Sequence, residues 1–241
     1  MDGLHTPATS TLKAVRMETA HFLRTVPLFA RLDDAELQRF AELTREKNYP
    51  KGSVIVFEDD PGDSLFIVRE GRVKVVLIGE DGREVILGVL GVGEYFGELS
   101  LIDDQPRSAH VIAMEETTLC VLRREDFRRR VEANASVAWS LLVELSRRLR
   151  RADGKIHGLA LLDVPGRIAR LLLDFAAESN GGEAIDKPLT HQTIAHMIGA
   201  SRETVSRTIR DFQIQGLIRV ERRRISVANR PGLKQLAQAR V

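Results

Sequence analysis

The 241-residue sequence predicts an α+β protein with a strand-rich N-terminal part and a helical C-terminal part. Between residues 53 and 123, apolar residues alternate with polar ones in short runs separated by turns, which is typical of β-strands. Between residues 138 and 159, apolar residues recur at steps of four and three, which indicates a long helix. Between residues 190 and 212, a glycine separates two short helical patterns, which indicates a helix-turn-helix.

The composition is that of an ordinary globular protein and excludes several other classes. Hydrophobic residues make up 43% of the chain and charged residues 29%, which is the usual range. A single cysteine, Cys120, rules out an internal disulfide framework and a four-cysteine iron–sulfur cluster within one chain. The histidines have no zinc-ligand spacing, and no nucleophile–base pair is evident, so we expect neither a metal centre nor an enzyme. Without a signal peptide or a long apolar run, we expect a cytoplasmic protein without a membrane-spanning segment.

Charge is distributed unevenly along the chain. Residues 165–241 carry 13 Lys and Arg against 7 Asp and Glu, whereas residues 1–164 carry 23 against 27. A basic C-terminal part beside a mildly acidic body indicates a polyanionic partner for one end only.

The N-terminal half is expected to begin with a disordered tail, because residues 1–20 are rich in Thr, Ala and Ser without clear periodicity. Helical spacing from Leu28 to Leu43 then predicts a helix with Asp33 as its N-cap. The many short strands at near-regular intervals predict a sandwich or a jelly roll. We expect strands at residues 54–57, 65–68, 73–78, 85–87, 108–113 and 117–122.

The segment from Phe96 to Ala109 places a glycine turn, a carboxylate, an arginine and a hydroxyl close together. Backbone N–H groups and the Arg107 guanidinium suit a cyclic phosphate, because a guanidinium matches phosphate oxygens better than an ammonium does. Ser108 can donate to the same phosphate, and Glu98 can accept from a ribose 2′-OH. The alternative is a surface turn with a Glu–Arg pair of little energetic value. We predict a cyclic-nucleotide site formed by Gly97, Glu98, Leu99, Arg107, Ser108 and Ala109.

The long helix carries a heptad seam that starts at Ala138 and is flanked by arginines. Such a narrow apolar stripe favours pairing with a second copy of the same helix, so we expect a parallel homodimer. The alternative is that the helix packs on its own sheet. The residues predicted at the dimer contact are Leu142, Leu145, Leu149, Ala152, Ile156 and Leu159.

The helix-turn-helix pattern has Thr190 and Ser201 as candidate N-caps and Gly199 at the turn, where a positive φ is needed. Arginine and glutamate on the outer face of the second helix can read guanine and cytosine edges, and its hydroxyls can hold phosphates. The alternative is a solvated face with i,i+4 ion pairs. A hairpin over residues 217–227 follows as a wing, with Arg222 and Arg223 near the DNA backbone. The candidate DNA-binding residues are Thr190, Ser201, Arg202, Glu203, Thr204, Ser206, Arg207 and Arg210.

Three segments in this order resemble the catabolite activator/fumarate-nitrate regulator (CRP/FNR) family of bacterial transcription factors, and most nearly its cyclic-AMP receptor branch. They are Gly97–Leu99 with Arg107–Ala109, then Leu162–Arg167, and then Ser201–Arg207. The resemblance implies that the phosphate and ribose contacts come from the first segment and the base contacts in the major groove from Arg202, Glu203 and Arg207. It also implies a palindromic operator in double-stranded DNA and RNA polymerase as a further partner. The contact of the family with the polymerase is not carried over, because the loop at residues 178–187 is shorter and more acidic here.

With this resemblance, the predicted domains are a disordered tail (1–20), a cyclic-nucleotide-binding β-roll (21–135), a coiled-coil dimerisation helix (136–163) and a winged helix-turn-helix (164–241). One departure from the cyclic-AMP receptors concerns the residues that recognise the base of the bound nucleotide. Their Thr-Ser pair on the dimer helix is matched by Ala152 and Asp153, and Asp153 can accept from an adenine amino group or from guanine N1–H and N2–H₂. The expected effector is therefore cyclic AMP or cyclic GMP. A cyclic dinucleotide, or a regulator with a vestigial pocket, remains an alternative.

Overall fold

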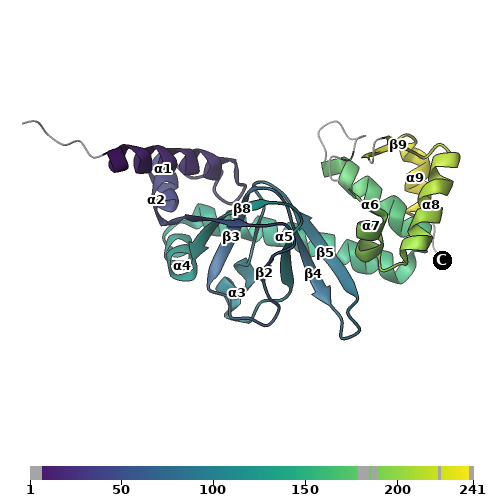
Figure 1. Cartoon of the computed structure of the whole chain (residues 1–241), viewed down its shortest axis with the longest axis horizontal. Helices are drawn as coiled ribbons and strands as arrows, with labels where there is room; N and C mark the ends of the chain where they lie inside the picture. Colours follow the sequence, from purple (N-terminus) through teal and green to yellow (C-terminus); the bar gives the residue numbers. More distant parts are fainter. Residues whose placement is uncertain (1–6, 179–184, 186–188, 222–223, 239–241) are drawn as a thin grey trace, which may run out of the picture. The chain divides into compact units, whose positions relative to one another are not determined.

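The structure is a computed structural model of the chain that describes residues 7–178, 185, 189–221 and 224–238. The chain divides into two compact units, one formed by residues 1–78 and 87–147 and the other by residues 79–86 and 148–241. Figure 1 labels their elements. Those up to residue 161 are α1 (Pro7–Thr25), α2 (Asp34–Leu43), β1 (Arg45–Tyr49), β2 (Val54–Val56), β3 (Ser64–Glu70), β4 (Val73–Ile78), β5 (Glu84–Leu90), β6 (Tyr95–Phe96), α3 (Glu98–Asp103), β7 (His110–Ala113), β8 (Thr117–Arg123), α4 (Arg124–Ala133) and α5 (Ala135–Leu161).

The strands form two four-stranded sheets, which confirms the predicted β-roll. One sheet has the order β1-β8-β3-β6 and the other β2-β7-β4-β5. The strand pairs described are antiparallel, with Phe66 of β3 opposite Val121 of β8 and Phe96 of β6. Both sheets contribute to one apolar cluster, which contains Val56, Phe66, Val68, Val73, Phe96, Val111, Leu119 and Val121.

Strands β3 and β8 are buried on both faces. Successive side chains of a strand point to opposite faces, so alternate residues of each strand pack in two different apolar clusters. Phe66 and Val68 point to the cluster between the sheets. Leu65 and Ile67, with Cys120 and Leu122 of β8, join a second cluster that includes residues of α1, α2, α4 and α5. Cys120 is fully buried there as a small core residue.

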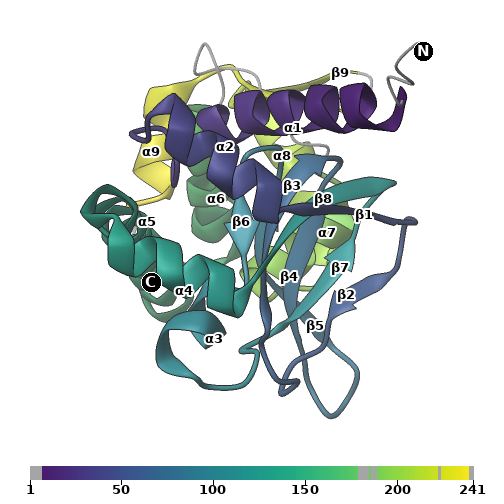
Figure 2. The same ribbon diagram turned by 90° about the vertical axis from the view of Figure 1, so that its left-hand side faces the viewer.

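Part of the tail predicted as disordered is helical, because residues 7–20 lie in α1, and residues 1–6 lie outside the described residues. The helix is held by contacts with residues distant in sequence, which the composition of residues 1–20 could not indicate. Arg69 of β3 donates to Glu18 at 2.6 Å and to Thr19 at 3.2 Å, and its guanidinium lies 5.7 Å from the centroid of the Phe22 ring. Figures 1 and 2 show α1 and α2 side by side. The Asp33 cap of α2 is confirmed, because its carboxylate accepts from the Glu36 N–H at 2.8 Å.

Strands β1 and β6 were not expected from the sequence. The residues of β1 are mostly exposed, so they show no period-two pattern, and the strand is defined by its pairing with β8. Strand β6 has only two residues, which is too short for a pattern, and it pairs with β3. Both strands therefore depend on a partner that is distant in sequence.

The second unit contains α6 (Val164–Glu178), α7 (His191–Ile198), α8 (Arg202–Ile214), β9 (Ile218–Glu221), β10 (Arg224–Val227) and α9 (Arg230–Leu236). Its core draws on all of these elements and includes Ile168, Leu172, Ile194, Val205 and Phe212. The hairpin predicted as a wing is present as β9 and β10, with Ile218 opposite Val227. Arg222 and Arg223 lie outside the described residues, as does most of the loop at 178–187.

Helix α5 covers most of the predicted dimerisation helix. Four residues of its predicted seam are large, apolar and exposed in the single chain: Leu142 is 56% exposed, Leu149 64%, Ile156 65% and Leu159 56%. Leu145 differs, because it packs partly against the N-terminal core of the same chain. An apolar stripe of this kind on one helix is characteristic of an interaction surface.

Candidate functional site: a buried arginine and an exposed recognition helix

Arg107 is a buried cation held by main-chain carbonyl groups. It is 5% exposed. Its Nη1 donates to the Gly97 carbonyl and its Nη2 to the Ser64 carbonyl, both at 2.8 Å. The guanidinium carbon lies 5.7 Å from the centroid of the Phe66 ring, which stacks on Phe96 at 5.0 Å. These contacts fix the plane of the guanidinium.

Gly97 is required at its position for two reasons. Its φ is +86°, in the left-handed region that favours glycine. A Cβ built on Gly97 would lie 2.4 Å from Arg107 Nη1 and 2.9 Å from the Ser64 carbonyl oxygen. Any other residue would therefore displace the arginine, so the structure brings Gly97 and Arg107 together as the sequence predicts.

Arg107 forms no ion pair among the described residues. Burial lowers the pKa of this guanidinium, although the carboxylates of Asp63, Glu98 and Asp60 all act to raise it. An arginine nevertheless stays protonated in proteins. A buried cation whose partners are neutral carbonyls creates a favourable position for an anion.

The other predicted ligand-binding residues fall into two groups. Glu98 and Ala109 are buried, at 2% and 6% exposure. Leu99 and Ser108 are exposed, so Ser108 is accessible beside the buried Arg107. Asp153 is exposed on α5, within the residues assigned to the second unit.

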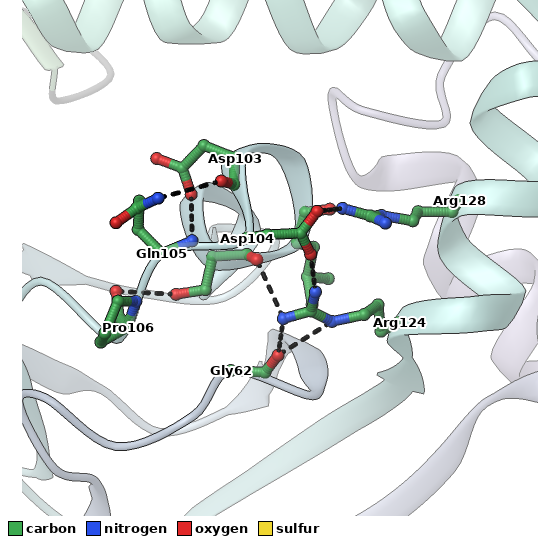
Figure 3. A network of polar contacts seen from close by, with 9 residues as sticks. Gly62, Asp103, Asp104, Gln105, Pro106, Arg124 and Arg128 are labelled. Atoms are coloured by element: carbon green, nitrogen blue, oxygen red, sulfur yellow. Dashed lines mark hydrogen bonds and ion pairs between the residues drawn. The ribbon is translucent and has the colours of Figure 1, made fainter.

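Sequence reasoning missed several residues that build the surroundings of Arg107. Ser64 supplies a carbonyl, and Gly62 leaves room for the site, since a Cβ there would lie 2.3 Å from Ser100 Cβ and 3.2 Å from Arg107 Cζ. Figure 3 shows that Arg124 of α4 reaches both Gly62 and Asp104. The signal in the sequence for these residues is the Asp-Pro-Gly-Asp run at residues 60–63, which indicates a turn but not a site.

The helix-turn-helix is present with its predicted caps. The Thr190 hydroxyl accepts from the Thr193 N–H at 3.0 Å, and the Ser201 hydroxyl accepts from the Thr204 N–H at 3.1 Å. Gly199 ends α7 with φ +63°. These residues set the start of both helices and the turn between them.

Helix α8 has a buried and an exposed face, as its sequence pattern predicts. Val205, Ile209 and Phe212 are at most 2% exposed, and Thr208 is also buried, with its hydroxyl donating to the Thr204 carbonyl at 2.9 Å. The predicted base-reading face is solvent-exposed, with Thr204 half-buried at its edge. The exposed residues are Arg202, Glu203, Ser206, Arg207 and Arg210.

Neither a metal-binding cluster nor a membrane-spanning helix is present among the residues that the structure describes. No group of three or more His, Cys, Asp or Glu is arranged to hold a metal ion. None of the helices in the described part of the chain is long and apolar enough to cross a membrane.

Comparison with known proteins defines the class. Residues 46–134 match the model of a cyclic nucleotide-binding domain, and residues 166–236 match that of a Crp-like helix-turn-helix domain. The chain is thus a DNA-binding transcription regulator with a cyclic nucleotide-binding domain, and not an enzyme.

Similarity to individual proteins extends over most of the chain. It is 31% identical over 215 residues to the "CRP-like cAMP-activated global transcriptional regulator" of Mycobacterium tuberculosis, which covers 88% of this chain and 96% of that protein. The structure of FixK2 from Bradyrhizobium japonicum aligns with a TM-score of 0.74 at 25% identity, over 81% of this chain and 98% of FixK2. The c-di-GMP-responsive regulator CLP of Xanthomonas campestris aligns with a TM-score of 0.67 at 26% identity, over 81% and 99%. The chain belongs to the CRP/FNR family of transcription regulators, as its motifs indicate.

Proposed function

We propose that the protein is a homodimeric transcription regulator that binds a cyclic nucleotide in the β-roll and then binds a palindromic operator. The observation that carries the proposal is the surroundings of Arg107: a buried guanidinium, held in a fixed plane by the Gly97 and Ser64 carbonyls, without an ion pair among the described residues. A phosphate suits this position, because its oxygens accept charge-assisted hydrogen bonds from the remaining N–H groups of the guanidinium.

The ligand-binding residues have separate roles in this proposal. Arg107 and the exposed Ser108 hydroxyl bind the cyclic phosphate, together with backbone N–H groups at Gly97, Glu98 and Leu99. Glu98 accepts from the ribose 2′-OH. The small side chain of Ala109 leaves room beside them. Asp153 of α5 accepts from the base.

The DNA-binding role is assigned to the exposed face of α8. Arg202 and Arg207 suit bidentate contact with guanine O6 and N7, and Glu203 suits contact with cytosine N4. Thr190, Ser201, Thr204, Ser206 and Arg210 are assigned to phosphates. Two such helices fit major grooves about one helical turn apart when the operator is palindromic.

The dimer is assigned to the seam of α5. Leu142, Leu149, Ile156 and Leu159 are each more than half exposed in the single chain, and Ala152 is also exposed. Burial against a second copy would remove this apolar surface from water, which is worth roughly 25 cal/mol per Å². Leu145 shares its side chain between the seam and its own core. The ligand can control DNA binding only if it binds one arrangement of the dimer more tightly than another.

Cyclic AMP is the effector that we favour, because the similar regulator of Mycobacterium tuberculosis is described as cAMP-activated. Cyclic GMP also fits the acceptor chemistry of Asp153. A cyclic dinucleotide is a further alternative, since CLP is described as c-di-GMP-responsive. We place the protein in the cytoplasm with RNA polymerase as a partner.

A regulator that binds DNA without a ligand is the second candidate. It is favoured by one observation: both terminal nitrogens of Arg107 already donate to main-chain carbonyls. Each nitrogen carries two N–H groups, so donors remain for a phosphate. For this reason we rank ligand control first.

One pair of titrations tests the proposal. Cyclic AMP, cyclic GMP and cyclic di-GMP are titrated into the purified protein by calorimetry, and affinity for an operator found by in vitro selection is measured with each. We expect one nucleotide to bind and to raise operator affinity at least about tenfold, a coupling of about 1.4 kcal/mol. Operator binding that is equally tight with and without every nucleotide would instead favour the ligand-independent regulator. Nucleotide binding that is unchanged in Arg107→Ala would remove the assigned site.

A further inference from the structure

Arg124, near the start of α4, contacts two segments that border Arg107 (Figure 3). It forms an ion pair with Asp104, in the loop between α3 and β7. It also donates from Nε to the Gly62 carbonyl at 3.0 Å and from Nη2 to the Ser100 carbonyl at 3.0 Å. A single guanidinium therefore joins the turn before β3 to the end of α3 and the loop that follows it.

Arg128, one helical turn further along α4, strengthens the same link. It donates from Nη2 to Asp104 at 2.7 Å and from Nε to the Leu101 carbonyl at 2.7 Å. Asp104 accepts from both arginines and adopts φ +59°, a conformation that Asp and Asn tolerate better than most residues. We call Arg124, Arg128 and Asp104 the clasp.

The two segments that the clasp joins determine where Arg107 lies. The Arg107 N–H donates to the Asp60 carbonyl at 2.9 Å, and the Asp59 N–H donates to the Arg107 carbonyl at 2.9 Å. Residues 103–106 lead directly into Arg107, and Gly62 lies so close that a Cβ there would approach its guanidinium to 3.2 Å. If the two segments separated, Arg107 could not keep its position between them.

The exposure of the clasp indicates a role other than support of the core. The Asp104 side chain is 59% exposed, that of Arg128 38% and that of Arg124 27%. Ion pairs at this exposure contribute little to the free energy of unfolding. They do fix the positions of the side chains relative to one another, because a carboxylate that accepts hydrogen bonds from two arginines can adopt few orientations. The hydrogen bond from Arg128 holds the pKa of Asp104 below its ordinary value, so the carboxylate is charged at neutral pH.

We propose that the clasp positions Arg107 for the phosphate of the ligand, with Arg124 and Asp104 as positioning residues that do not contact the ligand. Arg124 keeps the turn at residues 59–63 and the loop at residues 103–106 at a fixed separation, and Asp104 keeps Arg124 in place. This inference rests on the proposed function, because it concerns the same site. It adds residues from a different helix, α4, to those that determine nucleotide affinity.

The experiment is a double-mutant cycle in the full-length protein with Arg124→Gln, Asp104→Asn and the double variant. The control is Arg129→Gln, which removes an exposed arginine from the same helix. Affinity for cyclic AMP and cyclic GMP is measured by calorimetry, and the thermal midpoint is measured without ligand. Hydrogen exchange of the amides at residues 98–108 is followed in the same variants.

We expect Arg124→Gln to weaken nucleotide binding about tenfold and Asp104→Asn about threefold, with the double variant no weaker than Arg124→Gln alone, because residues in one network are not additive. Amide exchange at residues 98–108 should be faster in both variants, whereas Arg129→Gln should match the unmodified protein. The thermal midpoint of Asp104→Asn should stay close to that of the control.

Two outcomes separate this inference from the proposed function. If the unmodified protein binds no cyclic nucleotide, the proposed function fails. If it binds one and the affinities of Arg124→Gln and Arg129→Gln are equal, the clasp has no positioning role and the proposed function stands. Strictly additive losses that follow the thermal midpoints would also overturn the inference, because they would show a general loss of stability.

Discussion

The arginine of the proposed nucleotide site and the arginines on the exposed face of α8 lie in opposite surroundings. Arg107 is 5% exposed and donates to two main-chain carbonyls that belong to different parts of the chain. Arg202 and Arg207 are exposed on α8. In the proposed function, the first arginine is therefore held in place before its anionic partner binds, whereas the other two are accessible on the surface.

The two sites also differ in which residues support them. Helix α8 depends on neighbours in sequence: Ser201 caps its first turn, and Val205 and Ile209 fix its inner face. Arg107 depends on Ser64, which lies 43 residues away in sequence. Substitutions should therefore have effects of different size and kind at the two sites.

The largest effect is expected at Gly97. Gly97→Ala places a Cβ only 2.4 Å from the present position of Arg107 Nη1. The displaced guanidinium should weaken nucleotide binding about 100-fold, because hydrogen bonds to a charged group are worth roughly 1.5–3 kcal/mol each. Calorimetry with the nucleotide that binds the unmodified protein measures the change. The matched control is Gly82→Ala, since Gly82 has φ +76° but nothing within 4 Å of an added Cβ. Equal affinities in the two variants would show that Arg107 does not need this glycine.

Much of the recognition helix could be predicted from the sequence, because the determinants of its local structure are close together in the chain. Thr190, Gly199 and Ser201 each act within three or four residues, and the period of Val205, Ile209 and Phe212 gives the buried face directly. Thr208 was missed on that face because threonine is not an apolar signal. It is buried with its hydroxyl bonded to the carbonyl of Thr204.

Less of the nucleotide site could be predicted. Gly97 and Arg107 are ten residues apart, and the sequence indicated both. Ser64 and Gly62 are brought to Arg107 through the pairing of β3 with β8, and Arg124 is brought to Gly62 through the packing of α4. No local sequence pattern indicates either contact. The same reason explains α1, whose position is fixed by Arg69 of β3.

A smaller effect is expected at Arg202, and it concerns specificity. Arg202→Ala should relax the preference for one G·C pair of the operator by roughly 1–3 kcal/mol, because the bidentate contact with guanine is lost. Binding to the selected operator and to variants with single base-pair changes measures the effect. Gln213→Ala, at an exposed position of α8 outside the predicted set, should bind all of them as the unmodified protein does. An equal loss on every sequence would assign Arg202 to a phosphate.

The smallest effect is expected at Ser201 and tests whether α8 is determined locally. Its hydroxyl accepts from the Thr204 N–H at 3.1 Å, so Ser201→Ala should lower the free energy of unfolding by about 1 kcal/mol, the usual value of an N-cap. The matched control is Ser206→Ala, the same substitution at an exposed position inside the helix, where alanine has the higher helix propensity and stability should hold or rise slightly. Calorimetric unfolding of both variants without DNA measures the difference. If the two substitutions have the same effect, packing rather than the Ser201 cap holds the start of α8. Helix α8 would then depend on residues distant in sequence, as Arg107 does, and the contrast between the two sites would be weaker than the structure indicates.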